Sequence, residues 1–155
     1  MIQRIQSVYL LLTSLLSIIF LNGTYLTFFD NSGAPLRLTM TGLMRFTADN
    51  SPEKIGEAWM IYIPILLVSV LSMISVFLFR NRNLQLAVTR ILLVLIFISI
   101  AVSLIYTFMI LSGSNTEIDN WFKLLIPILQ LVFSWLAYKG IKKDDDLIKS
   151  YDRLR

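Results

Sequence analysis

The sequence contains no cysteine and no histidine. Without cysteine the chain can form neither a disulfide nor a thiolate metal site, and its compartment cannot be inferred from cysteine usage. Without histidine it lacks the commonest general acid or base and the commonest metal ligand. Charged residues are also scarce, at 15% of 155 residues against 56% that are hydrophobic. This composition is too apolar for a soluble domain of this size and predicts an integral membrane protein without cofactor or metal.

Motifs that carry chemistry are also missing. No glycine-rich phosphate loop, nucleophile elbow or metal-ligand spacing occurs. The run Asp144, Asp145 and Asp146 does not suit one divalent cation, because successive helical side chains diverge by about 100°. The net charge of +4 would suggest nucleic acid for a soluble protein, but in a membrane protein it mainly records topology. We therefore expect no enzymatic activity, no nucleic-acid partner and no identifiable small-molecule substrate.

Four apolar runs are long enough to span a membrane, since a spanning helix needs about 20 mostly apolar residues. The predicted spans cover residues 7–26, 59–79, 91–111 and 121–138. The expected fold is an all-α integral membrane protein, with a four-helix transmembrane bundle over residues 1–138 and a cytoplasmic amphipathic tail over 139–155. No small-x-small cleavage site follows Leu21, which favours an uncleaved signal anchor over a signal peptide.

Basic residues are distributed unequally between the two sides that this topology defines. The side of the loop 27–58 holds Arg37, Arg45, Lys54 and Lys123. The other side holds Arg4, Arg80, Arg82, Arg90, Lys139, Lys142, Lys143, Lys149, Arg153 and Arg155. The positive-inside rule then places both termini in the cytoplasm. Arg80, Arg82, Arg90, Lys142 and Lys143 are interpreted as topology anchors or, alternatively, as a patch for anionic lipid headgroups or an acidic partner.

The external insertion, residues 27–58, is the one sizeable segment outside the predicted spans. "TYLTFF" at 24–29 is followed by the turn formers "DNSGAP" and by the alternating "LRLTMT" at 36–41. This arrangement predicts a small external β-hairpin. Farther on, Ser51 could cap a short helix that begins at Pro52.

Polar side chains inside the spans are few and uncharged. Gln130 is the most polar central residue, and serines recur through the second and third spans, including Ser72 and Ser103. Ion-coupled pumps keep an ionisable residue in the middle of a span, and these spans have none there. Small polar residues can line a water-filled path, but more often they allow helices to pack closely and to form hydrogen bonds. We predict that the serine-bearing faces of the second and third spans meet.

The tail has the pattern of a short amphipathic helix. A helix starting at the three aspartates would have acidic residues at its positive end and basic residues at its negative end. Leu147, Ile148, Tyr151 and Leu154 would then form one apolar stripe. The stripe, with Arg153, is the predicted partner-binding surface; it could bind the headgroup region, the chain's own cytoplasmic loop or another protein.

Three segments, "MIQRIQSVYLLL", "FLFRNRNLQL" and "IKKDDDLIKSYDRLR", carry a resemblance to a known family. The chain is similar, from end to end, to the uncharacterised four-span inner-membrane proteins of domain of unknown function 4293, which are typical of Bacteroidota. The family pattern has Asp-Glu where this chain has Asp145 and Asp146. The resemblance implies a multi-pass protein of the bacterial cytoplasmic membrane, and it brings no activity or functional residues.

These observations lead to an expected function and two alternatives. We expect a non-catalytic accessory subunit of a larger inner-membrane complex, with other inner-membrane proteins and lipids as partners and protein translocation or membrane-protein biogenesis machinery as candidate hosts. A small oligomeric channel or exporter is the first alternative. A membrane enzyme acting on lipid or quinone is the second, and it would require external carboxylates such as Glu57 or Asp119.

Overall fold

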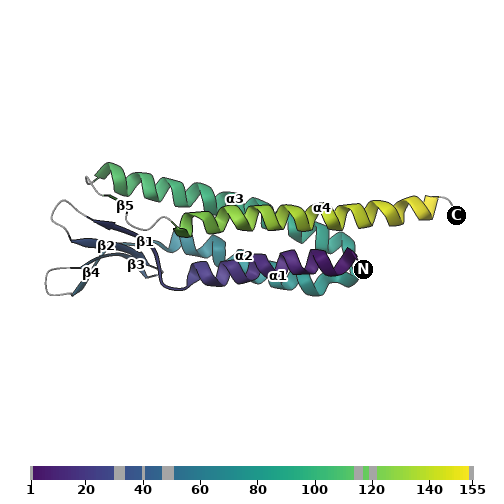
Figure 1. Ribbon diagram of the computed structural model, residues 1–155, viewed down its shortest axis with the longest axis horizontal. Helices are drawn as coiled ribbons and strands as arrows, with labels where there is room; N and C mark the ends of the chain where they lie inside the picture. Colours follow the sequence, from purple (N-terminus) through teal and green to yellow (C-terminus); the bar gives the residue numbers. More distant parts are fainter. Residues whose placement is uncertain are drawn as a thin grey trace.

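The computed structural model describes residues 2–29, 34–39, 41–46, 51–113, 117–118 and 122–153. In these ranges the chain forms four α-helices, two single-turn 3-10 helices and one five-stranded antiparallel sheet. The helices run side by side as an elongated bundle with the sheet at one end (Figure 1). The start of α1 and the end of α4 both lie at the opposite end, which we call the terminal end.

Long apolar helices make up most of the bundle. The helices are α1 (Ile2–Leu21), α2 (Trp59–Phe77), η1 (Leu78–Arg80), α3 (Arg82–Gly113), η2 (Phe122–Leu124) and α4 (Leu125–Arg153). Among the described residues, three segments are long and apolar enough to cross a membrane: Trp59–Arg80, Arg82–Ser112 and Phe122–Ile148. Ile5–Leu21 is a shorter apolar helix. A mostly helical fold with helices that can span a membrane is therefore confirmed.

The helices pack in a closed cycle, because α1 and α3 each contact both α2 and α4. Buried positions recur at alternating steps of three and four residues. In α1 they include Gln6, Leu10, Thr13, Ser17 and Phe20, and in α4 they include Gln130, Ser134, Ala137, Ile141 and Asp144. Such spacing is typical of knobs-into-holes packing between nearly antiparallel helices.

The interior of this bundle is more polar than its exterior. Ser17, Ser72 and Gln130 have no exposed surface, whereas Phe97 is 68% exposed and Phe108 is 71% exposed. In water such an apolar exterior would be a large aggregation-prone surface. Acyl chains remove this penalty, while the backbone groups are already satisfied within the helices. The distribution of side chains therefore fits a hydrocarbon environment.

The predicted first span is too long at its end, because α1 stops at Leu21 rather than Leu26. Gly23 adopts a φ of +77°, a left-handed conformation that glycine reaches without strain. The backbone amide of Asn22 donates to the carbonyl of Ile18 at 3.2 Å. Lys123 donates its ammonium to the carbonyl of Asn22, which is a favourable position for a cation at a helix C-terminus.

The sheet has the strand order β4-β3-β2-β1-β5. Its strands are β1 (Thr24–Phe29), β2 (Pro35–Thr39), β3 (Gly42–Phe46), β4 (Pro52–Gly56) and β5 (Glu117–Ile118). The predicted hairpin is confirmed as the pair β1 and β2, in which Leu26 lies opposite Leu38 and Phe28 opposite Leu36. These four side chains are buried and share a hydrophobic core with Ile61 of α2, so the sheet is packed onto the end of the bundle.

The short helix predicted after Ser51 is wrong. Residues Pro52–Gly56 instead form the strand β4, in which Glu53 pairs with Arg45 of β3. Because β4 lies at the edge of the sheet, a proline at its first position removes no required hydrogen bond. The pairing with β3 outweighs the local helix-start signal.

Two further boundaries differ from the prediction. The basic link between the second and third spans is mostly helical, since only Asn81 separates η1 from α3. The aspartates at 144–146 do not begin a separate helix, because α4 is continuous from Leu125 to Arg153. Gly140 does not interrupt it. A Cβ at Gly140 would approach Gln6 Cγ to 2.7 Å, so this glycine allows α1 and α4 to come close together.

Candidate functional site

The terminal end of the bundle carries most of the predicted functional residues. Arg80, Lys142 and Lys143 are exposed there. Arg82 is half-buried and donates from Nη1 to the backbone carbonyl of Asp144 at 3.2 Å. The guanidinium of Arg90 lies 5.9 Å from the centre of the Tyr138 ring. The basic residues therefore include one that joins α3 to α4 and others that are open to the surroundings.

Leu147, Ile148 and Tyr151 of the predicted partner-binding stripe lie on the last turns of α4. Leu147 is 45% exposed and Ile148 is 41% exposed, and both follow the buried Asp144 and Asp145. α4 extends here past the start of α1 (Figure 1). We call residues 146–153 the C-terminal arm. The side chains of Tyr151 and Arg153 and the whole of Leu154 lie outside the described residues.

A buried hydrogen bond that sequence reasoning missed joins the two ends of the chain. Gln6 donates from Nε2 to Oδ2 of Asp144 at 2.8 Å. Both side chains are at least nine-tenths buried. The bond connects α1 to α4 at the terminal end, and Arg82 brings α3 to the same residue. Asp144 is therefore a junction of three helices rather than a solvated helix start.

A seam of polar side chains continues from this junction along α1 and α4. Thr13 Oγ1 lies 3.4 Å from Ser134 Oγ, and Gln130 donates from Nε2 to Ser17 Oγ at 2.9 Å. Thr13 and Ser17 also donate their hydroxyls to carbonyls four residues earlier in α1. We call Gln6, Thr13 and Ser17 with Gln130, Ser134 and Asp144 the polar seam. Its members mainly bond to one another, as expected of buried polar groups.

Ser72 and Ser75 of α2 and Ser99 and Ser103 of α3 are buried, and those two helices pack together. Polar side chains of α2 and α3 contact each other near the terminal end. There Gln85 donates from Nε2 to the Ser75 carbonyl at 3.1 Å, and Ser75 Oγ lies 3.5 Å from Thr89 Oγ1. Ser72 donates to the Ser69 carbonyl within its own helix. That the serine-bearing faces of α2 and α3 meet at Ser72 and Ser103 stays a prediction, as does a stability role for both residues.

The opposite end of the bundle contains a small group of buried hydroxyls. Tyr25 of β1, Tyr62 of α2 and Ser103 of α3 have buried hydroxyl oxygens that lack a hydrogen-bond partner among the described residues. Burial raises the pKa of Tyr25. The rings of Tyr25 and Phe20 lie 4.7 Å apart. These contacts join the sheet to three helices at one point.

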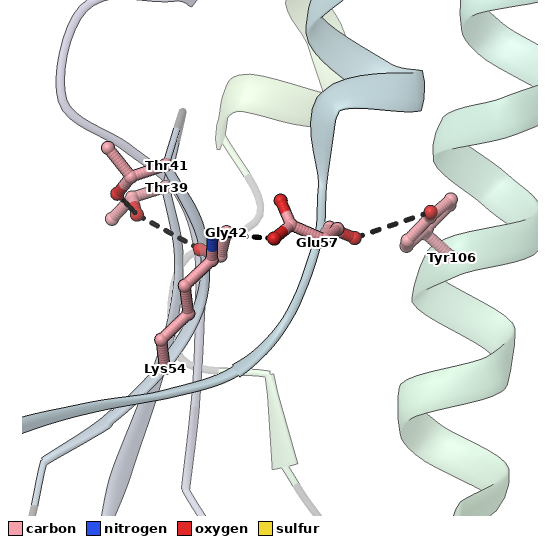
Figure 2. Close-up of polar contacts among 6 residues, drawn as sticks. All are labelled: Thr39, Thr41, Gly42, Lys54, Glu57 and Tyr106. Carbon is pink, nitrogen blue, oxygen red and sulfur yellow. Dashed lines mark hydrogen bonds and ion pairs between the residues drawn. The ribbon is translucent and has the colours of Figure 1, made fainter.

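Figure 2 shows how the sheet is also joined to α3. Tyr106 donates its hydroxyl to the backbone carbonyl of Glu57 at 3.4 Å. The Glu57 carboxylate accepts from Lys54 at 2.7 Å, on an exposed surface. Glu57 thus makes structural contacts both to its neighbouring strand β4 and to α3. Asp119, the other external carboxylate considered for an enzyme, lies outside the described residues.

In the described part of the chain, no three His, Cys, Asp or Glu residues come together in a way that could hold a metal ion. Two of the hollows in this part of the chain are largely apolar. One of about 430 Å³ lies between the sheet and α3, with Leu36, Leu43, Tyr106 and Met109 in its wall. Another of about 550 Å³ lies between α3 and α4. Both hollows suit contacts with apolar groups better than polar chemistry.

The fold and these sites define a membrane-associated class of protein: an apolar-surfaced helical bundle with a polar seam, closed at one end by a sheet. The chain matches, over residues 2–154, the family model described as Domain of unknown function (DUF4293), and it belongs to that family. Comparison with curated proteins finds no match, and comparison with solved structures also finds none.

Proposed function

We propose that this protein is a non-catalytic accessory subunit of a larger complex in the bacterial inner membrane. The supporting observation is the C-terminal arm. It extends a bundle helix without interruption and carries Leu147 and Ile148, each more than 40% exposed, where a partner could cover them. Each such side chain contributes about 1.5–3 kcal/mol when fully removed from water. Protein translocation and membrane-protein biogenesis machineries are candidate hosts.

The proposal includes a topology with four spans and both termini in the cytoplasm. The helix α1 has 20 residues, which corresponds to about 30 Å and to the thickness of a hydrocarbon core. Arg80, Arg82, Arg90, Lys142 and Lys143 belong to the terminal end of the bundle, which supports a cytoplasmic position for that end. A reporter that works only in the cytoplasm should be active when it is fused after Arg155. Activity of a periplasm-specific reporter would contradict the orientation.

The partner contact is tested with Leu147→Asp in the full-length protein. After mild detergent extraction, mass spectrometry should identify membrane proteins that co-purify with the unmodified chain and are depleted at least about five-fold with the variant. Leu84→Asp is the matched control, because Leu84 is an exposed leucine of α3 near the same end. If Leu147→Asp retains every co-purifying protein that Leu84→Asp retains, the arm is not a docking element.

The polar seam supports the alternative function, a small oligomeric channel or exporter, because hydroxyl and amide groups recur along the buried interface between α1 and α4. In that case Gln130→Leu should abolish flux in reconstituted vesicles while the protein stays folded. The accessory-subunit proposal expects no flux from either form.

A further inference from the structure

The groove between α3 and α4 opens outward from the bundle. It is lined by apolar side chains that include Leu93, Val94 and Phe97 of α3 and Val132, Trp135 and Leu136 of α4. Its volume is about 550 Å³. Phe97 and Val94 are 68% and 59% exposed, so the bundle itself leaves the groove uncovered. Acyl chains are the surroundings in which such a surface is favourable.

Two cations lie at one end of this groove. Arg90, about one turn before Leu93 and Val94 in α3, holds its guanidinium 5.9 Å from the Tyr138 ring of α4. Lys139 follows Trp135 by one turn and holds its ammonium 5.5 Å from the Trp135 ring. A cation over an aromatic face is held in place by the ring quadrupole. The mouth of the groove is therefore positively charged on both of its helices.

The same face of α4 stays basic beyond the groove. Lys142 and Lys143 follow Lys139 at three and four residues, and together with Asp146 they border a shallow depression. Asp146 lies about one turn farther from the groove than these lysines. The surface of α4 thus changes from apolar to basic within one turn of Trp135. This change, with an aromatic residue at the boundary, is the pattern expected where acyl chains meet phosphate groups.

We propose that the groove between α3 and α4 binds an anionic phospholipid, with its acyl chains along Val94, Phe97 and Val132 and its phosphate between Arg90 and Lys139. A zwitterionic lipid would leave the excess positive charge unbalanced. A helix of another protein would cover the apolar wall but would have to supply an acidic residue at the level of both cations. An anionic phospholipid satisfies the apolar and the charged part of the site together.

The test uses Trp135 as a local probe. Trp59 and Trp121 are replaced with Phe so that Trp135 is the remaining tryptophan, and the full chain is reconstituted in mixed vesicles. Quenching by brominated phosphatidylglycerol is compared with quenching by brominated phosphatidylcholine at equal mole fractions. Each basic residue near a membrane surface gives roughly five-fold preference for an anionic lipid. We expect phosphatidylglycerol to be preferred at Trp135 by at least that factor.

Variants separate this site from general attraction to the basic end. Arg90→Gln with Lys139→Gln should bring the preference to about one. Arg80→Gln should leave it unchanged, because Arg80 is an exposed basic residue of η1 that does not border the groove. Each variant is compared with itself in two lipids, so a change in the brightness of Trp135 does not affect the ratio.

Three results would overturn the proposal. Equal quenching by the two lipids in the unmodified site would mean that the groove holds ordinary bulk lipid. Absence of quenching by either lipid would mean that a protein surface, from a second copy or another partner, covers Trp135. Retention of the preference in the double variant would equally assign it to charges elsewhere.

Discussion

The helix α4 has two very different neighbours. Toward α1 it presents Gln130, Ser134 and Asp144, which are buried and bonded across the interface. Toward the outer side of α3 it presents Val132 and Trp135, which are about half exposed and line an open groove. One helix therefore makes a sealed polar contact on one side and leaves an unfilled apolar surface on the other.

The difference reflects what holds helices together in lipid. Apolar side chains gain little from leaving acyl chains, so close approach and hydrogen bonds supply most of the specificity between membrane helices. Gly140 permits the close approach of α4 to α1, and the polar seam supplies the hydrogen bonds. The groove has neither feature, which leaves it open for a ligand. Four substitutions test this contrast, from the largest expected effect to the smallest.

Gly140→Leu should have the largest effect. Even the Cβ of a larger residue would meet Gln6 Cγ at 2.7 Å, so the new side chain must displace the Gln6 side chain and separate it from Asp144. We expect a loss of about 3 kcal/mol, at the upper end of the usual cost of overpacking. Thermal unfolding in detergent measures it. If position 140 had free space around it, the same substitution should stabilise the protein, because leucine favours a helix more than glycine does. A rise in the thermal midpoint would therefore show that Gly140 is not in close contact with α1.

Asp144→Ala should have the next largest effect. The substitution removes the acceptor of Gln6 Nε2 but keeps the backbone carbonyl to which Arg82 donates. Leaving a buried amide unsatisfied costs about 1–3 kcal/mol. Asp146→Ala is the control, because Asp146 is exposed, and it should change the stability by less than about 0.5 kcal/mol. Equal losses of stability in the two variants would show that the negative charge of this segment stabilises the fold, rather than the hydrogen bond between Gln6 and Asp144.

Gln130→Leu should cost less than either. It removes the donor to Ser17, but Ser17 still donates to the carbonyl of Thr13. The Oε1 atom of Gln130 is buried and has no hydrogen-bond partner in the described part of the chain. Hydrogen bonds between membrane helices average about 0.6 kcal/mol, so we expect a loss of that order. Chemical denaturation in mixed micelles can resolve it. A loss as large as that of Asp144→Ala would indicate that the seam acts as one cooperative network.

Phe97→Ala should have the smallest effect on stability. The side chain lines the groove but is 68% exposed, so its removal leaves no internal cavity. We expect thermal unfolding in detergent to show a change in the free energy of unfolding below about 0.5 kcal/mol. A loss of several times that size would mean that the groove is closed in the folded protein, for example by a second copy of the chain.

The parts of the fold that depend on local pattern could be predicted from the sequence. The apolar runs identified the positions of α2, α3 and α4, and the alternation around Leu36 and Leu38 identified the strand β2. The strands β3 and β4 were missed because their burial does not alternate: four of the five residues of β4 are exposed. Their pairing depends on neighbours elsewhere in the sheet, which single-strand patterns do not record.

The candidate sites show the same division. The polarity of Gln130 and the basic character of Lys142 and Lys143 are visible in the sequence, but their partners are not. Gln6 and Asp144 are 138 positions apart, and no local pattern links them. The aspartates were therefore interpreted from the helix-dipole rule alone, which favours a helix start. Tertiary contact with Gln6 instead fixes Asp144 in the middle of a longer helix.

The continuity of α4 has a mechanical consequence. Because the C-terminal arm and the membrane-length part of α4 are one helix, any turn of that helix about its axis is passed on to Leu147 and Ile148 without a hinge to absorb it. Each residue of an α-helix advances the phase by about 100° and the rise by about 1.5 Å. A single residue inserted after Asp146 would thus re-aim the stripe while leaving the bundle intact. The rotational position of Leu147 and Ile148 around the helix axis, rather than the composition of the arm, then determines which direction these side chains face.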